Sequence, residues 1–220
     1  MALRIANHVI NRVIVIDDSE ESRRTYEYSL EELQLDIVYE TGPLETVEKS
    51  LVGIRSKADA IVCDYHLRKR NFSQFDGDDL VALSNKVNIP ALLCTTFTDS
   101  DITLMRSKRR FIPSLLKPAT FIPEMIVQGF ERCFFEFEGK FEASRKPWRT
   151  LVRVADIDES RRYFYVVVPG WDTEQKIRVY FDDTPRGVSD LVQLGQRFHA
   201  IANLGANSPD ELYFTDWEKS

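Results

Sequence analysis

Asp59-Ala60-Ile61-Val62-Cys63-Asp64 is the stretch of sequence that decides the fold. Ala60 to Cys63 are apolar without alternation, which is typical of a short strand that is buried on both faces of a sheet. Asp64 follows where this strand is expected to end. Because ligands of open α/β sheets bind outside the carboxyl ends of the strands, Asp64 is a candidate site residue. The simpler interpretation, which we favour for a lone aspartate, is that it caps the following loop.

Other apolar runs of the same kind alternate with segments of helical spacing. Strands are predicted at residues 12–16, 35–39, 60–63, 91–94 and 115–116. Helices are predicted at residues 22–33, with Ser19 as a cap, 44–54, 78–85 and 99–109. Residues 1–10 carry no strong signal and are read as a tail or an added strand. Continuous apolar strands that alternate with helices predict a doubly wound parallel sheet.

The predicted strands end in residues that can carry chemistry. The first ends in Asp17 and Asp18, the third in Asp64, the fourth in Thr95 and the fifth in Lys117. All of these ends are expected to open on one edge of the sheet, so the side chains are expected to meet in one crevice.

The sequence here resembles the receiver domain of two-component response regulators. The resemblance is carried by Asp17-Asp18 after Val13–Ile16, Asp64 after Ala60–Cys63, Thr95 after Leu92–Cys94, the pair Lys117-Pro118, and the loop Asp64-Tyr65-His66-Leu67 with Asp76-Gly77 beyond it. It covers about residues 10–140. It implies a flavodoxin-like, five-stranded parallel sheet and a sensor histidine kinase or phosphotransfer protein as a partner.

The resemblance also implies a magnesium site. Asp18 would hold Mg²⁺ directly, Asp17 partly through water, Asp64 as a ligand and His66 through its backbone carbonyl. Hard divalent cations prefer such oxygen donors. The alternative for Asp17 and Asp18 is a helix N-cap pair that the helix dipole favours.

The remaining roles that the resemblance implies concern the phosphoryl group. Asp64 would accept it as an acyl phosphate. Lys117 would pair with one phosphoryl oxygen and Thr95 would donate its hydroxyl to another.

Three features depart from the family pattern. The loop from Asp64 to Gly77 is long, and residues 68–75 begin with the basic run Arg68-Lys69-Arg70. We favour a solvated surface loop over a docking element for a kinase. Thr96 stands where a small residue is usual, and Ser114 stands where many receivers carry a switching aromatic. A receiver used without phosphorylation, as a scaffold, therefore stays an alternative.

A long helix is predicted from residue 120 to 144, with an aromatic stripe that includes Phe130, Phe134, Phe137 and Phe141. We favour packing of the stripe on the two neighbouring domains; the alternative is a homodimer interface. The predicted receiver domain spans residues 1–140, with its last helix extending to about 146, and a second domain spans 147–220.

The second domain is expected to be a small all-β barrel, SH3-like or OB-like. Its predicted strands are residues 151–155, 163–168, 176–181, 198–202 and 212–214, with a helical turn within 184–194. We favour a protein-interaction output, with an unknown protein target. The alternative is nucleic-acid binding by its aromatic and arginine residues, which nearby acidic residues oppose. No enzymatic output is expected, because His199 is its only histidine and has no nucleophile beside it in the sequence.

Composition limits the classes of function that the chain can have. The 220 residues are 43% hydrophobic and carry 29 Lys+Arg against 35 Asp+Glu, a net charge of −6. This balance argues against bulk nucleic-acid or membrane-surface binding. The three cysteines suit neither a disulfide framework nor a metal knuckle. With no signal peptide or membrane-spanning run, a cytoplasmic location is expected.

Overall fold

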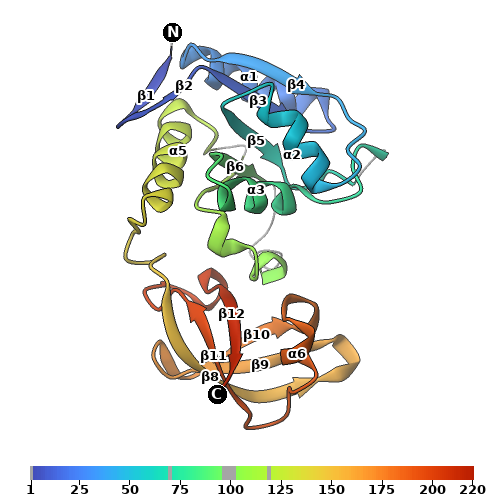
Figure 1. Cartoon of the computed structure of the whole chain (residues 1–220), viewed down its shortest axis with the longest axis vertical. Coiled ribbons are helices and arrows are strands. Elements are labelled where there is room, and N and C mark those ends of the chain that lie inside the picture. Colours follow the sequence, from blue (N-terminus) through green and yellow to red (C-terminus); the bar gives the residue numbers. More distant parts are fainter. Residues whose placement is uncertain (1, 69–70, 96–102, 118–119) are drawn as a thin grey trace. The chain divides into compact units, whose positions relative to one another are not determined.

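The computed structural model describes residues 2–68, 71–95, 103–117 and 120–220, which form two compact units (Figure 1). The first unit takes in residues 1–96 and 111–140, and the second takes in residues 97–110 and 141–220. The sequence predicted a single boundary between residues 140 and 147. It did not predict that residues 97–110, of which 103–110 are described, belong to the second unit. Each unit is described by itself below.

The first unit is built on a five-stranded parallel sheet with the strand order β4-β3-β5-β6-β7. This confirms the expected doubly wound sheet and all of its strands to within one residue. The strands are β3 (Arg12–Ile16), β4 (Asp36–Glu40), β5 (Ala60–Asp64), β6 (Ala91–Cys94) and β7 (Leu115–Leu116). Ala60 to Cys63 are fully buried, as their unbroken apolar character predicts.

Among the described residues, the α-helices of this unit are α1 (Glu20–Glu32), α2 (Val47–Arg55), α3 (Gly77–Lys86) and α5 (Pro123–Phe137), which lie against the sheet (Figure 1). Helices α1 and α5 share one core with alternate residues of the strands, including Val15 and Val62. Helix α2 contacts α3, which packs against β5 and β6. Ser19 caps α1 as expected, because its side chain accepts a hydrogen bond from the Ser22 N–H.

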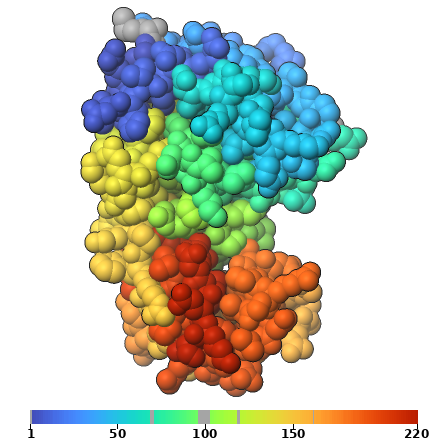
Figure 2. Space-filling model, in the orientation of Figure 1, coloured from blue at the N-terminus to red at the C-terminus, as the bar shows by residue number. Residues whose placement is uncertain are grey.

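The N-terminal residues form an added hairpin, which decides between the two expectations for this segment. Strand β1 (Leu3–Ile5) pairs with β2 (His8–Ile10), and Ile5 and Ile10 are buried in the core shared with α5. The His8 ring stacks on Phe134 of α5 with 4.0 Å between ring centroids. Figure 2 shows these N-terminal residues against the yellow surface of α5.

Two predicted helices are wrong in extent or type. The described part of the predicted helix 99–109 consists of 3-10 turns, η2 (Thr103–Met105) and η3 (Arg109–Phe111), and its first residues lie outside the described ones. Helix α5 ends at Phe137, not at residue 144. Gly139 follows with φ 75°, and the Lys140 N–H returns to the Phe135 carbonyl, which is a Schellman termination.

The end of α5 at Phe137 also bears on where the aromatic stripe packs. Phe130 and Phe134 pack in the core of the first unit, so the packing interpretation is confirmed for this half. The alternative, a homodimer interface on the helix predicted at residues 120–144, stays a prediction, for a helix that ends at Phe137.

The second unit contains a five-stranded antiparallel sheet in the order β10-β9-β8-β11-β12. The strands are β8 (Trp148–Asp158), β9 (Tyr163–Val168), β10 (Asp172–Tyr180), β11 (Arg197–Ala202) and β12 (Phe214–Lys219). The turn α6 (Arg186–Ser189) lies where a helical turn was predicted. The predicted strand 212–214 is wrong in extent, because β12 begins at Phe214 and ends at Lys219. Leu212 and Tyr213 are buried but precede the strand.

In the described ranges, no helix is both long and apolar enough to cross a membrane.

Candidate functional site

The carboxyl ends of β3 and β5 bring two of the predicted site residues together. Ile16 pairs with Cys63, so Asp17 and Asp64 follow on neighbouring strands at the same level. The electrostatic interaction between these two carboxylates is strong enough to raise the pKa of Asp17. Asp18, the next residue along the chain, raises it further. The structure therefore groups the three predicted carboxylates at one edge of the sheet.

Asp17 is the buried member of this group, with 2% of its surface exposed. Its Oδ1 accepts a hydrogen bond from the Ser19 N–H at 2.7 Å, which favours the charged form. Burial outweighs this hydrogen bond and, with the neighbouring carboxylates, raises the pKa of Asp17 from 3.8 to about 6. The site therefore carries negative charge at neutral pH at an electrostatic cost.

Tyr26 of α1 is a contributor that the sequence did not reveal as part of the site. The sequence marked it only as an apolar position of the helix, but its hydroxyl interacts with the Asp17 carboxylate and with the Cys94 thiol. Burial and these neighbours raise the pKa of Tyr26 well above its ordinary value, so it stays a neutral donor. A tyrosine on the buried face of the helix that follows Asp17-Asp18 was the available signal.

Asp64 is held by the turn that follows it. Its Oδ2 accepts a hydrogen bond from the His66 N–H at 2.8 Å, and the Gly77 N–H closes the loop onto the Tyr65 carbonyl at 2.7 Å. A Cβ on Gly77 would lie 1.9 Å from the Asp64 carbonyl oxygen, so only glycine fits here. The chain is thus folded tightly around Asp64. The hydrogen bond from the His66 N–H is the loop cap that the simpler interpretation expected, and the role of Asp64 in a site stays a prediction.

Thr95 and Lys117 lie at the ends of the next two strands. Cys94 pairs with Leu116, and the Thr95 N–H donates to the Leu116 carbonyl at 2.9 Å, which places the two residues side by side along the sheet edge. Thr95 is buried and Lys117 is exposed. Thr96 and Pro118 lie outside the described residues.

The loop after Asp64 is packed rather than solvated, which corrects our preferred interpretation. Leu67, Phe72 and Phe75 are buried, and Ser73 pairs with Leu44 in an isolated bridge. Of the basic run, Arg68 is described: it is exposed and pairs with Asp76 at 3.0 Å. Lys69 and Arg70 lie outside the described residues. The docking interpretation of this basic run is untested.

Ser114 is buried beneath helix α5. A Cβ on Gly129 would lie 3.0 Å from the Ser114 Oγ and 2.8 Å from a Leu92 methyl group. The helix therefore approaches the sheet so closely at Gly129 that a large side chain at position 114 has no room. The aromatic that many receivers carry at this position is excluded by packing.

A metal site needs the carboxylates to converge on one point. In the parts of the chain that the structure describes, no three His, Cys, Asp or Glu side chains are already arranged to hold an ion. The donors grouped here are nevertheless all oxygens, and the pKa of Asp17 is raised by burial and by the charges of Asp64 and Asp18, which a cation would offset. The donor chemistry fits a hard divalent ion such as Mg²⁺.

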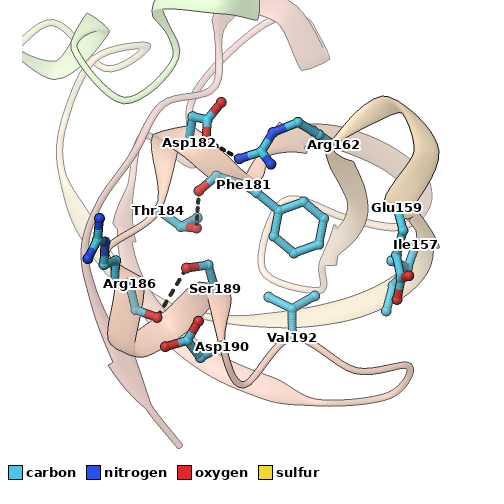
Figure 3. A pocket seen from close by; sticks show the side chains of 10 residues that line it. All are labelled: Ile157, Glu159, Arg162, Phe181, Asp182, Thr184, Arg186, Ser189, Asp190 and Val192. Carbon is cyan, nitrogen blue, oxygen red and sulfur yellow. Dashed lines mark hydrogen bonds and ion pairs between the residues drawn. The ribbon is translucent and has the colours of Figure 1, made fainter.

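The second unit offers a different hollow of about 610 Å³ at one end of its sheet (Figure 3). Arg162 reaches Asp182 across its rim at 2.7 Å, and the Thr184 hydroxyl donates to the Phe181 carbonyl at 2.8 Å. The polar contacts drawn in Figure 3 join lining residues to one another. Arg162 and Asp182 form an exposed ion pair, and Glu159, Arg186 and Asp190 add further charged side chains to the lining.

The aromatic residues of the second unit are packed rather than arrayed for stacking. Tyr163 is buried and meets Tyr180 edge to face, and the Trp171 indole N–H donates to the Ala206 carbonyl at 2.9 Å. Trp148 is exposed at 47%, with the Lys146 ammonium 4.5 Å from its ring centre. A row of free aromatic faces for bases is therefore not formed by these residues.

No protein-family model matches the sequence. No curated protein matches it either. Solved structures that are similar to the chain include a response regulator receiver domain protein from Clostridium thermocellum, at 13% identity over 58% of this chain and 96% of that one, TM-score 0.43. They also include the receiver domain of Francisella response regulator 1452, at 18% identity over 57% and 98%, TM-score 0.42. A third is the receiver domain of the putative response regulator NarL from Mycobacterium tuberculosis, at 17% identity over 54% and 94%, TM-score 0.41.

Proposed function

We propose that this protein is a two-component response regulator whose first unit accepts a phosphoryl group on Asp64. The observation that supports this most is the grouping of Asp17, Asp18 and Asp64 at the carboxyl edge of a five-stranded parallel sheet. Structural caps would not need three grouped carboxylates, of which Asp17 has a pKa that is raised by burial and by the charges of Asp64 and Asp18. A site that binds a cation and a phosphoryl group does need them.

The proposed chemistry is the transfer of a phosphoryl group from a phosphohistidine of a kinase or phosphotransfer protein. A carboxylate oxygen of Asp64 forms the new O–P bond while the N–P bond of the donor breaks, and the protonated donor imidazole leaves neutral. Bound Mg²⁺ supplies positive charge against the carboxylates and the phosphoryl oxygens. Asp17, Asp18 and Asp64 are the side chains that would hold it, with the backbone carbonyl of His66.

Two further side chains have roles in this proposal. Lys117 pairs its ammonium with one phosphoryl oxygen, and Thr95 donates its hydroxyl to another. Thr95 follows β6, the neighbour of β5, and Lys117 follows β7, the next strand along the same sheet edge. The acyl phosphate adds roughly −1.5 to −2 charge at this edge, which is the change that the rest of the molecule must read.

The second unit is proposed as the output domain. Its antiparallel sheet is consistent with a small barrel of the SH3-like or OB-like kind, and a protein is its proposed target. The packed aromatics do not favour the nucleic-acid alternative. We propose a binding output for it rather than an enzymatic one.

The experiment is binding of beryllofluoride, a phosphoryl mimic, in the presence of Mg²⁺. The expected result is a new ¹⁹F resonance from a fluoroberyllate bound to the protein, lost in Asp64→Asn and retained in Asp36→Asn, whose carboxylate is 72% exposed. Absence of a bound resonance in the wild-type protein would rule out the phosphoacceptor and leave the scaffold alternative.

A further inference from the structure

Two donors from different elements hold the buried Asp17 carboxylate. The Ser19 N–H, in the turn between β3 and α1, donates to its Oδ1 at 2.7 Å. The hydroxyl of Tyr26, in the second turn of α1, is a side-chain hydrogen-bond partner of the same carboxylate. The proposed phosphoryl chemistry gives Asp17 a role at the metal and leaves Tyr26 without one.

Tyr26 is itself held in place. Its side chain is 2% exposed and belongs to the core that α1 and α5 share with the sheet. The centre of its ring lies 4.7 Å from the centre of the Phe121 ring. Phe121 is tied to the same helix a second time, because the Ser29 hydroxyl donates to its backbone carbonyl at 2.7 Å. The ring of Tyr26 therefore cannot swing away from Asp17 without disturbing packed core residues.

The second donor matters because an aspartate carboxylate turns easily. The torsion about its Cβ–Cγ bond is broad, so a single hydrogen bond leaves the direction of the other oxygen poorly defined. Donors from the turn and from the helix together restrict this torsion at Asp17. Hydrogen-bond partners of metal ligands commonly act in this way, and their removal costs roughly 10–100-fold in metal affinity.

The size of the ion decides how much this restriction contributes to binding. Mg²⁺ requires near-ideal octahedral geometry with bonds of about 2.0–2.1 Å, whereas Ca²⁺ accepts flexible arrangements of oxygens at about 2.3–2.6 Å. A carboxylate whose direction is fixed therefore favours the smaller ion. A carboxylate that is free to turn suits the larger ion as well.

We propose that Tyr26 is a positioning residue of the metal site, whose hydroxyl fixes the Asp17 carboxylate and thereby favours Mg²⁺ over Ca²⁺. The inference rests on the metal site of the proposed function and does not depend on phosphoryl transfer. It adds to the site a residue from the core face of α1, which the strand ends do not supply.

The test is ion binding by the full chain, followed through the amide NMR signals of Ser19 and His66. Both N–H groups donate to carboxylates of the site, those of Asp17 and Asp64, so their signals report on a bound ion. Titrations with Mg²⁺ and with Ca²⁺ give the two affinities and their ratio without any phosphoryl donor.

Tyr26→Phe removes the hydroxyl and keeps the ring beside Phe121. The expected result is a roughly tenfold weaker affinity for Mg²⁺ and a change of less than about threefold for Ca²⁺. The matched control is Tyr28→Phe on the same helix. Tyr28 is 77% exposed, so its variant is expected to bind both ions as the wild-type protein does.

An unchanged ratio of the two affinities in Tyr26→Phe overturns the inference. An equal loss for both ions also overturns it, because the hydroxyl is then a general support of the fold. A second variant, Phe121→Leu, keeps the hydroxyl but loosens the ring, and is expected to lower the ratio by a smaller factor. If Tyr26→Phe does not fold, an unchanged ratio in Phe121→Leu overturns the inference.

Failure of this inference and failure of the proposed function give different results. If Mg²⁺ moves neither reporter amide of the wild-type protein, the metal site and the role of Tyr26 fall together. If Mg²⁺ and fluoroberyllate both bind but Tyr26→Phe leaves the ratio unchanged, only the inference falls. If the Mg²⁺ preference is lost in Tyr26→Phe but no fluoroberyllate binds the wild-type protein, the phosphoacceptor falls and the role of Tyr26 stands.

Discussion

Asp17 is ionised at neutral pH at a cost that comes first from its burial and then from the neighbouring carboxylates. The carboxylate is buried beside Asp64 and Asp18, and its pKa is raised from 3.8 to about 6. In the native state it therefore binds a proton more tightly than in the unfolded state. Stability gained from that proton is complete below about pH 4 and is lost as the pH rises through about 6. At neutral pH Asp17 is therefore ionised, and this lowers the stability of the fold, as is common at binding sites.

Asp17→Asn should therefore stabilise the protein in a pH-dependent way. At pH 8, in the presence of a chelator, we expect an increase in the free energy of unfolding on the order of 1–2 kcal/mol, reduced from the full effect of the pKa shift because water partly screens the site. At pH 4 we expect no difference, because Asp17 is then protonated. Urea denaturation at both pH values measures this, with Asp36→Asn as the exposed control. An equal effect at both pH values would contradict the origin assigned to the Asp17 pKa.

Gly77 sets the position of Asp64 through its backbone. A Cβ at this position would come within 1.9 Å of the Asp64 carbonyl oxygen, and backbone cannot swing aside as a flexible side chain does. Gly77→Ala is expected to cost more than about 2 kcal/mol of stability and to abolish beryllofluoride binding. Gly187→Ala, where nothing lies within 4 Å of the added Cβ, is the control. A Gly77→Ala protein that binds the mimic normally would show that the loop can move without disturbing the phosphoacceptor.

At the scale of elements, helix α5 ends because of one glycine. Gly139 has φ 75° and no atom within 4 Å of an added Cβ, so alanine there meets only the conformational cost. Gly139→Ala is expected to destabilise the protein by about 1 kcal/mol. Gly53→Ala, in the interior of α2 and also without neighbours within 4 Å, is expected to stabilise it by about 0.5–1 kcal/mol. Thermal unfolding of the pair measures both signs; the same sign in both variants would contradict this explanation.

The elements that the sequence predicted well are those whose signal is local. The strands around Val15, Val62 and Leu92 are unbroken apolar runs that no helix with a polar face could produce, so their positions followed from the residues. Their ends then placed Asp17 beside Asp64, because parallel strands share an edge. Ser19 could be read as a cap for the same reason.

The failures have two physical causes. Phe141 continued the helical spacing past Gly139-Lys140, although that pair is a local termination signal. In the described part of the predicted helix 99–109, tertiary contacts outweigh local preference: the segment forms 3-10 turns, and the carbonyls of residues 109 and 110 accept from Arg145. Tyr26 had a signal in its place on the helix after Asp17, whereas the carbonyl partners of Arg106 lie 103 and 106 residues away in the sequence.

At the scale of the whole molecule, the second unit is discontinuous in sequence. Residues 97–110 belong to it although a parallel-sheet domain surrounds them in the chain. Arg106 is among the largest fully buried side chains, and it satisfies the carbonyls of Pro209 and Leu212. A chain cut at the boundary that the sequence suggested would lose this arginine and expose the Phe214 ring. Each buried acceptor left without a donor costs about 1–3 kcal/mol, against a total stability of about 5–15 kcal/mol for a domain.

Residues 141–220 alone are therefore expected not to unfold cooperatively. A single chain in which residues 97–110 are joined by a flexible linker to residue 141 is expected to recover a cooperative thermal transition, because the linker restores the donor to both carbonyls. The same chain with Arg106→Gln should lose most of that gain, whereas Arg149→Gln, which breaks an exposed pair with Glu218, should keep it. Circular dichroism against temperature measures all four. If residues 141–220 melt as cooperatively as the linked chain, the second unit folds stably without residues 97–110, and the hydrogen bonds of Arg106 contribute little to its stability.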